Sequence, residues 1–374
     1  MQEGTQFAHD PGCELAKPRV RPLNRAMPTS LLTSTRAAAC ALLLVSPGGF
    51  AQVHNPSIPV KTEGQVAFVE GPAYHADGSV YFSDVENNRI MRRRADGSFE
   101  VWRQPSGRAN GLLFDHEGRL VACEGGAFGG NRRVTRTEHD GMVTVLTDNF
   151  DGKKYNSPND LTIDSKGRIY FTDPRYGSRD GMEQKTPGGA AIEGVYRIDA
   201  PGQVARVLAG EVDRPNGIAV SPDDKWLYVV DNNNGQFGTR KVWRFELAAD
   251  GSVKPKSRKE LMDFGRGRGG DGLKVDRDGR IYIAAGRWMP SPPNETIEMK
   301  GGIYVLNSDG RLVDFIPVII DEVTNLCFAG KELDVLYVTA GHTLFSVQMK
   351  VKGHMAWPKP VGDGIRDVPV TKPD

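Results

Sequence analysis

The chain has 374 residues, a formal net charge of +1 at pH 7 and 44 glycines. A chain of this length can bury a large core as one or two domains, and its near-neutral charge gives no electrostatic reason to expect a nucleic-acid partner. Frequent Asp-Gly and Asn-Gly pairs, without a long amphipathic helical pattern, favour an all-β protein.

The amino-terminal fifty residues differ in character from the rest. From Met27 onward, a basic residue precedes an apolar run over Ala37–Val45, and small residues lead to Ala51, which is the pattern of a signal peptide. The apolar run is too short to span a membrane permanently. We therefore expect residues 27–51 to be a signal peptide and the mature protein to be periplasmic or secreted, without a membrane span. The alternative for the apolar run is a buried core segment. Residues 1–26 are interpreted as an upstream extension, with translation starting at Met27.

Export would leave two cysteines, Cys123 and Cys327, in the mature chain. Both lie within apolar strand patterns of distant repeats, so we expect two buried thiols rather than a disulfide. The sequence has no Cys-x-x-Cys or His-x-x-x-His spacing, and a zinc site of the usual kind is not predicted.

Residues 52–374 contain six copies of one unit. Each copy has a polar residue before a short apolar strand, then a turn rich in Asp and Gly, and then a second strand. The copies start about 40–57 residues apart, which is typical of propeller blades, and further strand–turn–strand patterns fill the intervals. These residues are therefore predicted to form a six-bladed β-propeller, with a β-sandwich as the alternative. The polar residues that open the copies are Glu70, Asn110, Asn159, Asn216, Asp271 and Asn325.

Two longer segments, Arg175–Glu193 and Gly286–Lys300, interrupt the third and fifth copies. Loops of this length on a compact scaffold are often lids or pocket walls, and surface decoration is the alternative. Closure of the ring requires a strand from Val60–Ala67 or from the tail after Phe345.

The innermost strands of a propeller line its axis, so the six polar residues should form a ring around a central channel. All six carry a side-chain oxygen, and none is His or Cys. Two carboxylates and several amide oxygens suit a hard divalent cation, Ca²⁺ first, with Mg²⁺ or Zn²⁺ as alternatives.

The copies resemble the SMP-30/gluconolactonase (regucalcin-like) family across residues 65–350. This resemblance implies a six-bladed propeller that holds one divalent metal in its channel and hydrolyses a small-molecule sugar lactone. The motifs that carry it are Glu70-Gly-Pro, Ser157-Pro-Asn-Asp-Leu, Phe171-Thr-Asp-Pro-Arg-Tyr-Gly, Arg214-Pro-Asn-Gly-Ile and Gly270-Asp-Gly-Leu. The metal ligands that it implies are Glu70, Asn159, Asn216 and Asp271. We interpret Asn110, Asp160 and Asn325 as candidates for contacts with substrate. The alternative is a structural turn role for Asn110 and Asn325, and orientation of Asn159 or structural hydrogen bonding for Asp160.

Two positions depart from related patterns. Animal members of the family have an arginine two residues before the third-copy asparagine, where this chain has Ser157. This difference concerns contacts with substrate rather than the metal. The fluorophosphatase-like enzymes have an acidic residue three positions after the fifth-copy aspartate, where this chain has Lys274, so a second calcium ion is not expected there.

The predicted function is that of an exported carboxylic-ester hydrolase that opens a sugar lactone. A metal would polarise the carbonyl, and Asp271 would act as the base that activates water, with Asp160 as the second candidate. One alternative is a phosphotriesterase or esterase of the diisopropyl-fluorophosphatase or paraoxonase type. The other is a propeller that binds a sugar or a protein without turnover.

Overall fold

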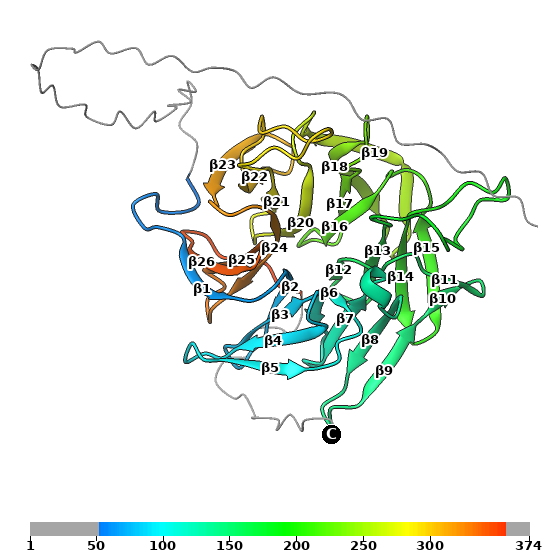
Figure 1. Cartoon of the computed structure of the whole chain (residues 1–374), viewed down its shortest axis with the longest axis horizontal. Helices are drawn as coiled ribbons and strands as arrows, with labels where there is room; N and C mark the ends of the chain where they lie inside the picture. Colours follow the sequence, from blue (N-terminus) through cyan, green and yellow to red (C-terminus); the bar gives the residue numbers. More distant parts are fainter. Residues whose placement is uncertain (1–51, 357–374) are drawn as a thin grey trace, which may run out of the picture. The chain divides into compact units, whose positions relative to one another are not determined.

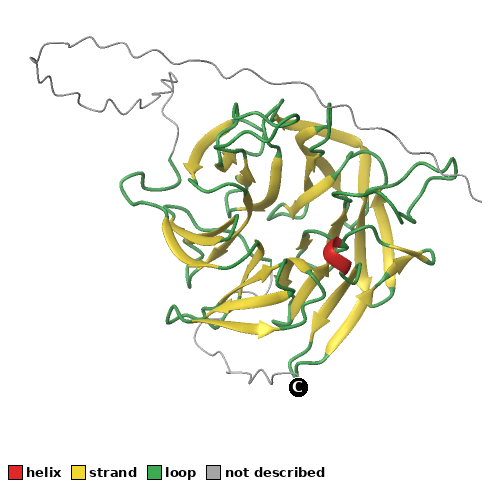
Figure 2. Ribbon diagram, viewed as in Figure 1, coloured by secondary structure: helices red, strands yellow, loops and turns green. Residues whose placement is uncertain are grey.

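The computed structural model describes residues 52–356, and almost all of its regular structure is β-strand. Six four-stranded antiparallel sheets are arranged around a common axis (Figures 1 and 2), and a two-stranded hairpin pairs β10 (Asn149–Phe150) with β11 (Lys153–Lys154). Within the described residues the only helix is the short 3₁₀ turn η1 (Ala127–Gly129). The predicted six-bladed β-propeller is confirmed.

The blades follow one another along the chain, and each is built from the axis outward. Blade 1 comprises β2 (Val69–Tyr74), β3 (Val80–Asp84), β4 (Arg89–Arg93) and β5 (Phe99–Arg103). Blade 2 comprises β6 (Ala109–Phe114), β7 (Leu120–Glu124), β8 (Arg133–Thr137) and β9 (Val143–Thr147). Blade 3 comprises β12 (Leu161–Ile163), β13 (Ile169–Asp173), β14 (Gly194–Ala200) and β15 (Gln203–Leu208).

The remaining three blades continue this order. Blade 4 comprises β16 (Pro215–Val220), β17 (Trp226–Asn232), β18 (Arg240–Leu247) and β19 (Val253–Asp263). Blade 5 comprises β20 (Gly270–Val275), β21 (Ile281–Ala285), β22 (Gly302–Leu306) and β23 (Leu312–Pro317). Blade 6 comprises β24 (Val323–Ala329), β25 (Val335–Ala340), β26 (Thr343–Gln348) and β1 (Lys61–Gln65).

Both segments that the sequence offered for closing the ring belong to blade 6. Strand β1 from the amino-terminal segment pairs antiparallel with β26, so that Lys61 lies opposite Ser346 and Gln65 opposite Thr343. Residues about 280 positions apart are therefore joined by main-chain hydrogen bonds, and the first and last parts of the propeller hold each other in place.

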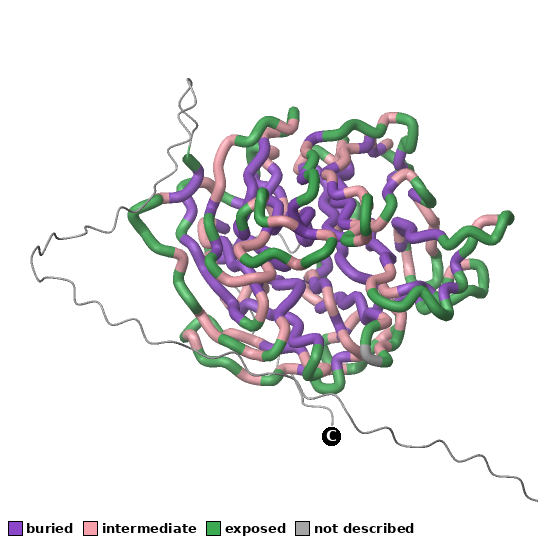
Figure 3. Tube along the Cα trace, turned by 45° about the horizontal axis from the view of Figure 1, so that its top comes forward, coloured by how far each residue is buried: buried purple, intermediate pink, exposed green. Residues whose placement is uncertain are grey.

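The hydrophobic core lies between successive blades rather than in one central cluster. Residues of β7 and β13 share one cluster, for example Val121 and Phe171, and Tyr282 of blade 5 packs edge-on against Phe328 of blade 6 at 5.0 Å. Figure 3 shows the buried segments gathered toward the middle of the propeller and the exposed ones in the outer loops. Cys123 and Cys327 are both buried and unpaired, which confirms the prediction of two free thiols.

The innermost strands of five blades each contain a β-bulge next to the channel. In blade 5, Gly270 lies opposite Ala285 and Leu273 lies opposite Ile283, so three steps on β20 match two on β21. Corresponding shifts occur in blades 1, 2, 4 and 6. An extra residue of this kind bends a strand and redirects its side chains. The bulge therefore places Asp271 and its counterparts at the mouth of the channel.

The strand register of blade 6 places Asn325 differently from its predicted position in the ring. In blade 6, Val323 lies opposite Ala340 and Leu326 opposite Val338, so Thr324 occupies the position that Asp271 has in blade 5. Asn325 therefore stands one position further along its strand than the sequence comparison indicated. Its place corresponds to the glycine that follows the ring residue in blades 1, 2, 4 and 5, and to Asp160 in blade 3.

Those glycines allow the innermost strands to approach one another closely. A Cβ added to Gly71 would lie 2.2 Å from the main-chain oxygen of Asn110, and one added to Gly217 would lie 2.2 Å from that of Asp271. Any side chain at these positions would push two neighbouring blades apart. The ring of polar residues therefore depends on the glycines beside it.

The predicted signal peptide and upstream extension lie outside the described residues. Across residues 52–356, the structure has no helix of the length and apolar character needed to cross a membrane.

Candidate functional site

A cavity of about 590 Å³ opens at one end of the central channel. Its floor is formed by the ring, and its walls include residues from both of the long loops that interrupt the repeats. The two loops are therefore pocket walls, as one reading of the sequence predicted. The ring residues that line the cavity are Glu70, Asn110, Asn159, Asn216 and Asp271, and the loop residues are Arg175, Tyr176, Ser178, Arg287, Ser291 and Glu295.

Asp160 and Asn325 lie in a layer beneath the ring and do not line this cavity. Each is only 1% exposed, and each accepts a hydrogen bond at 2.9 Å through Oδ1 from the next main-chain nitrogen. Asp160 Oδ2 lies 3.5 Å from Nζ of Lys274, and Asn325 Nδ2 lies 3.5 Å from Oε2 of Glu70. Their predicted roles, as substrate contacts and for Asp160 as second candidate base, stay predictions.

The two ring carboxylates are buried close enough to influence each other. Burial raises the pKa of the Glu70 carboxyl well above its ordinary value, and the charge of Asp271 raises it further. Burial also raises the pKa of Asp271 to about 6, although the nearby Arg268 opposes this rise. Two desolvated negative charges side by side are costly, and a cation between them would relieve that cost.

Arg268 is a site residue that the sequence reasoning missed. Its guanidinium lies 2.6 Å from Oδ2 of Asp271 and donates a second hydrogen bond, at 2.7 Å, to the main-chain oxygen of Val323. The ion pair takes one of the acceptor positions of Oδ2, while Oδ1 is buried without a hydrogen-bond partner. The only signal in the sequence was an arginine inside the glycine-rich run just before the ring aspartate.

Three buried oxygens of the ring are unpartnered in the same way: Asn110 Oδ1, Asn216 Oδ1 and Asp271 Oδ1. A buried polar atom without a partner costs about 1–3 kcal/mol, so such atoms gathered in one cavity indicate a binding site. No three His, Cys, Asp or Glu side chains within residues 52–356 lie close enough to hold a metal ion. A cation here would therefore need asparagine oxygens, which is the donor set predicted for this ring and which suits Ca²⁺.

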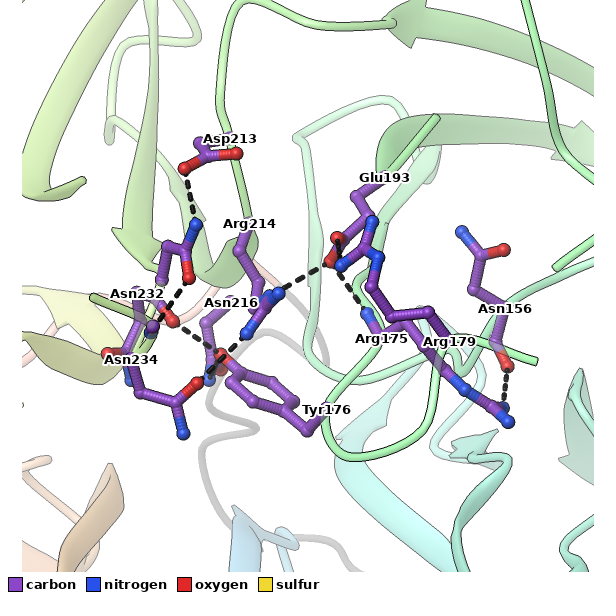
Figure 4. Close-up of polar contacts among 12 residues, drawn as sticks. Asn156, Arg175, Tyr176, Arg179, Glu193, Asp213, Arg214, Asn216, Asn232 and Asn234 are labelled. Carbon is purple, nitrogen blue, oxygen red and sulfur yellow. Dashed lines mark hydrogen bonds and ion pairs between the residues drawn. The ribbon is translucent and has the colours of Figure 1, made fainter. Parts of the chain in front are cut away.

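Tyr176, from the first long loop, orients one of the ring amides. The Nδ2 of Asn216 donates to the Tyr176 hydroxyl at 2.8 Å, which leaves the amide oxygen for another partner (Figure 4). The hydroxyl donates in turn to the main-chain oxygen of Asn232 at 3.3 Å. Desolvation and the charge of Asp271 raise the pKa of Tyr176 above its ordinary value, so the phenol stays protonated.

Arg214 fastens this loop onto blade 4. Its guanidinium lies 5.3 Å from the centre of the Tyr176 ring and 3.2 Å from Oε2 of Glu193. A cation over an aromatic face is attractive, and together with the ion pair it fixes the position of Tyr176 (Figure 4).

Asp173 holds the segment that leads to Asn159. Its two carboxylate oxygens accept hydrogen bonds from the main-chain nitrogens of Asn156 at 2.8 Å and Ser157 at 2.7 Å. Burial raises the pKa of Asp173 to about 7 despite these bonds. Asp231 holds the segment before Asn216 in the same way. An acidic residue in the last two positions of the second strand thus positions a ring asparagine in both blades.

A family model described as the SMP-30/Gluconolactonase/LRE-like region matches residues 68–342. The match spans most of the chain, and this protein belongs to that family. The family predicted from the sequence motifs is thereby confirmed.

Individual relatives agree with this assignment. A gluconolactonase of Zymomonas mobilis is 28% identical over 318 residues, which cover 79% of this chain and 83% of that protein. A 6-deoxy-6-sulfogluconolactonase of Pseudomonas putida is 28% identical over 266 residues, which cover 70% of this chain and 78% of that protein.

Solved structures show the same likeness. The structure of a gluconolactonase from Xanthomonas campestris has a TM-score of 0.64 at 29% identity and covers 79% of this chain and 91% of that one. A regucalcin from Agrobacterium tumefaciens, a calcium-binding protein, has a TM-score of 0.61 at 19% identity and covers 79% of this chain and 95% of that one. At that identity the regucalcin attests to the fold alone. The general activity that these relatives support is lactone hydrolysis.

Proposed function

We propose that this chain is an exported, metal-dependent lactonase that opens a sugar lactone. The observation that carries the proposal is the set of buried, unpartnered ring oxygens on the floor of the cavity. The gluconolactonase relatives support lactone hydrolysis, and the sulfogluconolactonase relative acts, by its name, on a lactone that bears a sulfonate. The predicted signal peptide supports export.

Glu70, Asn159, Asn216 and Asp271 would hold the metal. Ca²⁺ is favoured over Zn²⁺ because every donor is oxygen, and over Mg²⁺ because Mg²⁺ usually keeps several waters instead of binding to a set of four protein ligands. When bound, a divalent cation supplies Lewis-acid polarisation of the lactone carbonyl and stabilises negative charge that develops on its oxygen. The two ring carboxylates would balance the charge of that ion.

Asp271 serves as the base in this proposal, within limits set by Arg268. A carboxylate oxygen can accept about two hydrogen bonds, and Arg268 takes one of those on Oδ2. The second acceptor position of Oδ2 would then be left for the attacking water, while Oδ1, which has no hydrogen-bond partner, would contact the metal. Arg268 also favours the ionised carboxylate, which is the form that accepts a proton.

The loop residues exclude bulk water and orient the ring. Tyr176 fixes the amide of Asn216 with its oxygen available, and the loop that carries Tyr176 covers one side of the cavity. Excluding water strengthens each electrostatic contact inside the site.

The experiment measures acid release from a panel of sugar lactones, first with metal-stripped protein and then after a divalent metal is added back. The proposal predicts no hydrolysis beyond the spontaneous rate without metal and recovery when Ca²⁺ is added back. Absence of hydrolysis for every lactone with every divalent metal would overturn it. Hydrolysis of a phosphotriester alone would favour the phosphotriesterase alternative, and sugar binding without turnover would favour the non-catalytic one.

Export has its own test. Expression of the full chain in a Gram-negative host, followed by fractionation and amino-terminal sequencing, should give a periplasmic or secreted protein that starts just after Ala51. A cytoplasmic protein with its leader intact would contradict the prediction.

A further inference from the structure

Three arginines line the cavity, and they differ in how their charges are balanced. Arg268 pairs with Asp271 at 2.6 Å. Arg287 pairs with Glu295 at 3.0 Å and with Glu322 at 2.6 Å. Arg175 has a different set of partners.

The guanidinium of Arg175 is held by main-chain oxygens alone. Nε donates to Ser178 at 2.7 Å, Nη1 to Asn156 at 3.2 Å and Nη2 to Asp180 at 3.3 Å. The nearby carboxylate of Glu193 accepts from the main-chain nitrogen of Arg175, and its ion pairs are with other arginines (Figure 4). Within residues 52–356, no carboxylate lies at ion-pair distance from the Arg175 guanidinium. Its positive charge is therefore fixed in position without being neutralised.

Arg175 also retains unused hydrogen-bond donors. A guanidinium has five N–H groups, and the three contacts with main-chain oxygens use three of them. The planar arrangement of these donors matches the paired oxygens of carboxylate, sulfonate and phosphate groups.

The guanidinium lies on the same side of the cavity as the approach to Asn159. A Cβ added to Gly126 would lie 2.9 Å from Nη1 of Arg175, and the main-chain nitrogen of Gly126 donates to Oγ of Ser157 at 2.8 Å. Gly126, Ser157, Asn159 and Arg175 all line the cavity. A group bound by Arg175 is thus within the same cavity as a lactone carbonyl at the ring.

The charges in the rest of the cavity do not prevent an anion from entering. Its five carboxylates would be balanced by its three arginines together with a divalent cation at the ring. The carboxylate of Glu86 is exposed to solvent, which screens its charge.

We propose that Arg175 binds an oxyanion of the substrate, so that the preferred lactone carries a carboxylate, sulfonate or phosphate group away from its lactone carbonyl. This inference rests on the proposed lactonase function. Arg175 acts in it as a determinant of specificity and takes no part in breaking the lactone bond.

The test compares charged and neutral substrates in the calcium-loaded protein. Glucono-1,5-lactone is the neutral substrate, and its 6-phosphate, its 6-sulfonate analogue and a lactone with a carboxylate at that end are the charged ones. Arg175→Gln should raise KM at least tenfold for one or more of the charged lactones and change values for the neutral lactone less than threefold. Arg175→Lys should restore part of the preference. Arg179→Gln removes a half-exposed arginine from the same loop and should leave both classes unchanged.

Two results would overturn the inference: a wild-type protein with no preference for any charged lactone, or an Arg175→Gln variant that loses activity equally on both classes at an unchanged Tm. If no lactone is hydrolysed, the lactonase proposal fails, and calorimetry with gluconate 6-phosphate and gluconate 6-sulfonate still tests the subsite. Binding in the wild type that weakens at least tenfold in Arg175→Gln supports it. Equal binding in both proteins, or no binding in either, contradicts it.

Discussion

The guanidinium of Arg268 lies 2.6 Å from Oδ2 of Asp271, so one of the two ring carboxylates is held by a buried arginine that lies just before the strand of that carboxylate. The contact fixes the orientation of Asp271 and leaves Oδ1 buried without a hydrogen-bond partner. An isolated carboxylate at this position would be free to rotate and would ionise with more difficulty.

Replacement of Arg268 should therefore shift the pH dependence of the reaction. Without the opposite charge, the pKa of Asp271 rises, so the ionised base appears only at higher pH. In Arg268→Gln, the acidic limb of kcat/KM should move upward by about one pH unit or more, and kcat should fall about 10- to 100-fold. Arg268→Lys should keep most of the acidic limb in place. An unmoved limb in a folded Arg268→Gln protein would show that this pair does not control the base.

Tyr176→Phe should weaken metal binding without abolishing it. The variant loses the hydroxyl that accepts from Asn216, so the ring amide is no longer held with its oxygen available. Removing a group that orients a metal ligand typically lowers affinity about 10- to 100-fold. Calcium titration calorimetry measures this effect. Tyr74→Phe is the control, because Tyr74 lies at the other end of β2 from the ring residue Glu70. This variant should bind calcium as the wild type does. Equal calcium affinity in the two variants would show that Tyr176 does not orient Asn216 for metal binding.

Gly217→Ala tests whether the ring needs a close approach of the blades. The new Cβ would meet the main chain of Asp271 at 2.2 Å, so we expect a loss of about 1–3 kcal/mol in unfolding free energy and weaker calcium binding. Gly210→Ala is a matched control because open space surrounds that position. Equal unfolding free energies for the two variants in urea would contradict the proposed packing.

Asp173 should make the folded state less stable as pH rises from about 4 to 7. The pKa of its carboxyl is about 7 in the folded protein and ordinarily 3.8, so the folded state binds the proton more tightly. In this window the unfolded state has already lost that proton, and the free energy of unfolding falls with increasing pH by at most about 1.4 kcal/mol per pH unit from this group.

The measurement compares the wild type with Asp173→Asn by urea denaturation at pH 5 and pH 8. The variant loses one hydrogen-bond acceptor, which destabilises it at pH 5, but it avoids the buried charge at pH 8. The deficit of the variant should therefore shrink as pH rises. A deficit that grows with pH would contradict the raised pKa of Asp173.

The sequence predicted the propeller because each blade is assembled from local hairpins whose turn residues recur along the chain. The same repetition predicted most of the polar residues that form the ring. Asn325 lies one position away from its predicted place in the ring. A one-residue bulge sets the register of β24, and the apolar pattern around Leu326 is the same for either register. Arg268 and Tyr176 were missed because their contacts depend on how loops fold back over the channel, which no local pattern encodes.

The most direct test of the central claim is to follow calcium binding and lactone hydrolysis in one titration of the metal-free protein. We predict one calcium ion per chain, hydrolysis that rises in proportion to occupancy of that site, and loss of both calcium binding and hydrolysis in Glu70→Gln and Asn216→Leu. Full hydrolysis of the lactone by metal-free protein, or by a Glu70→Gln variant that no longer binds calcium, would contradict it.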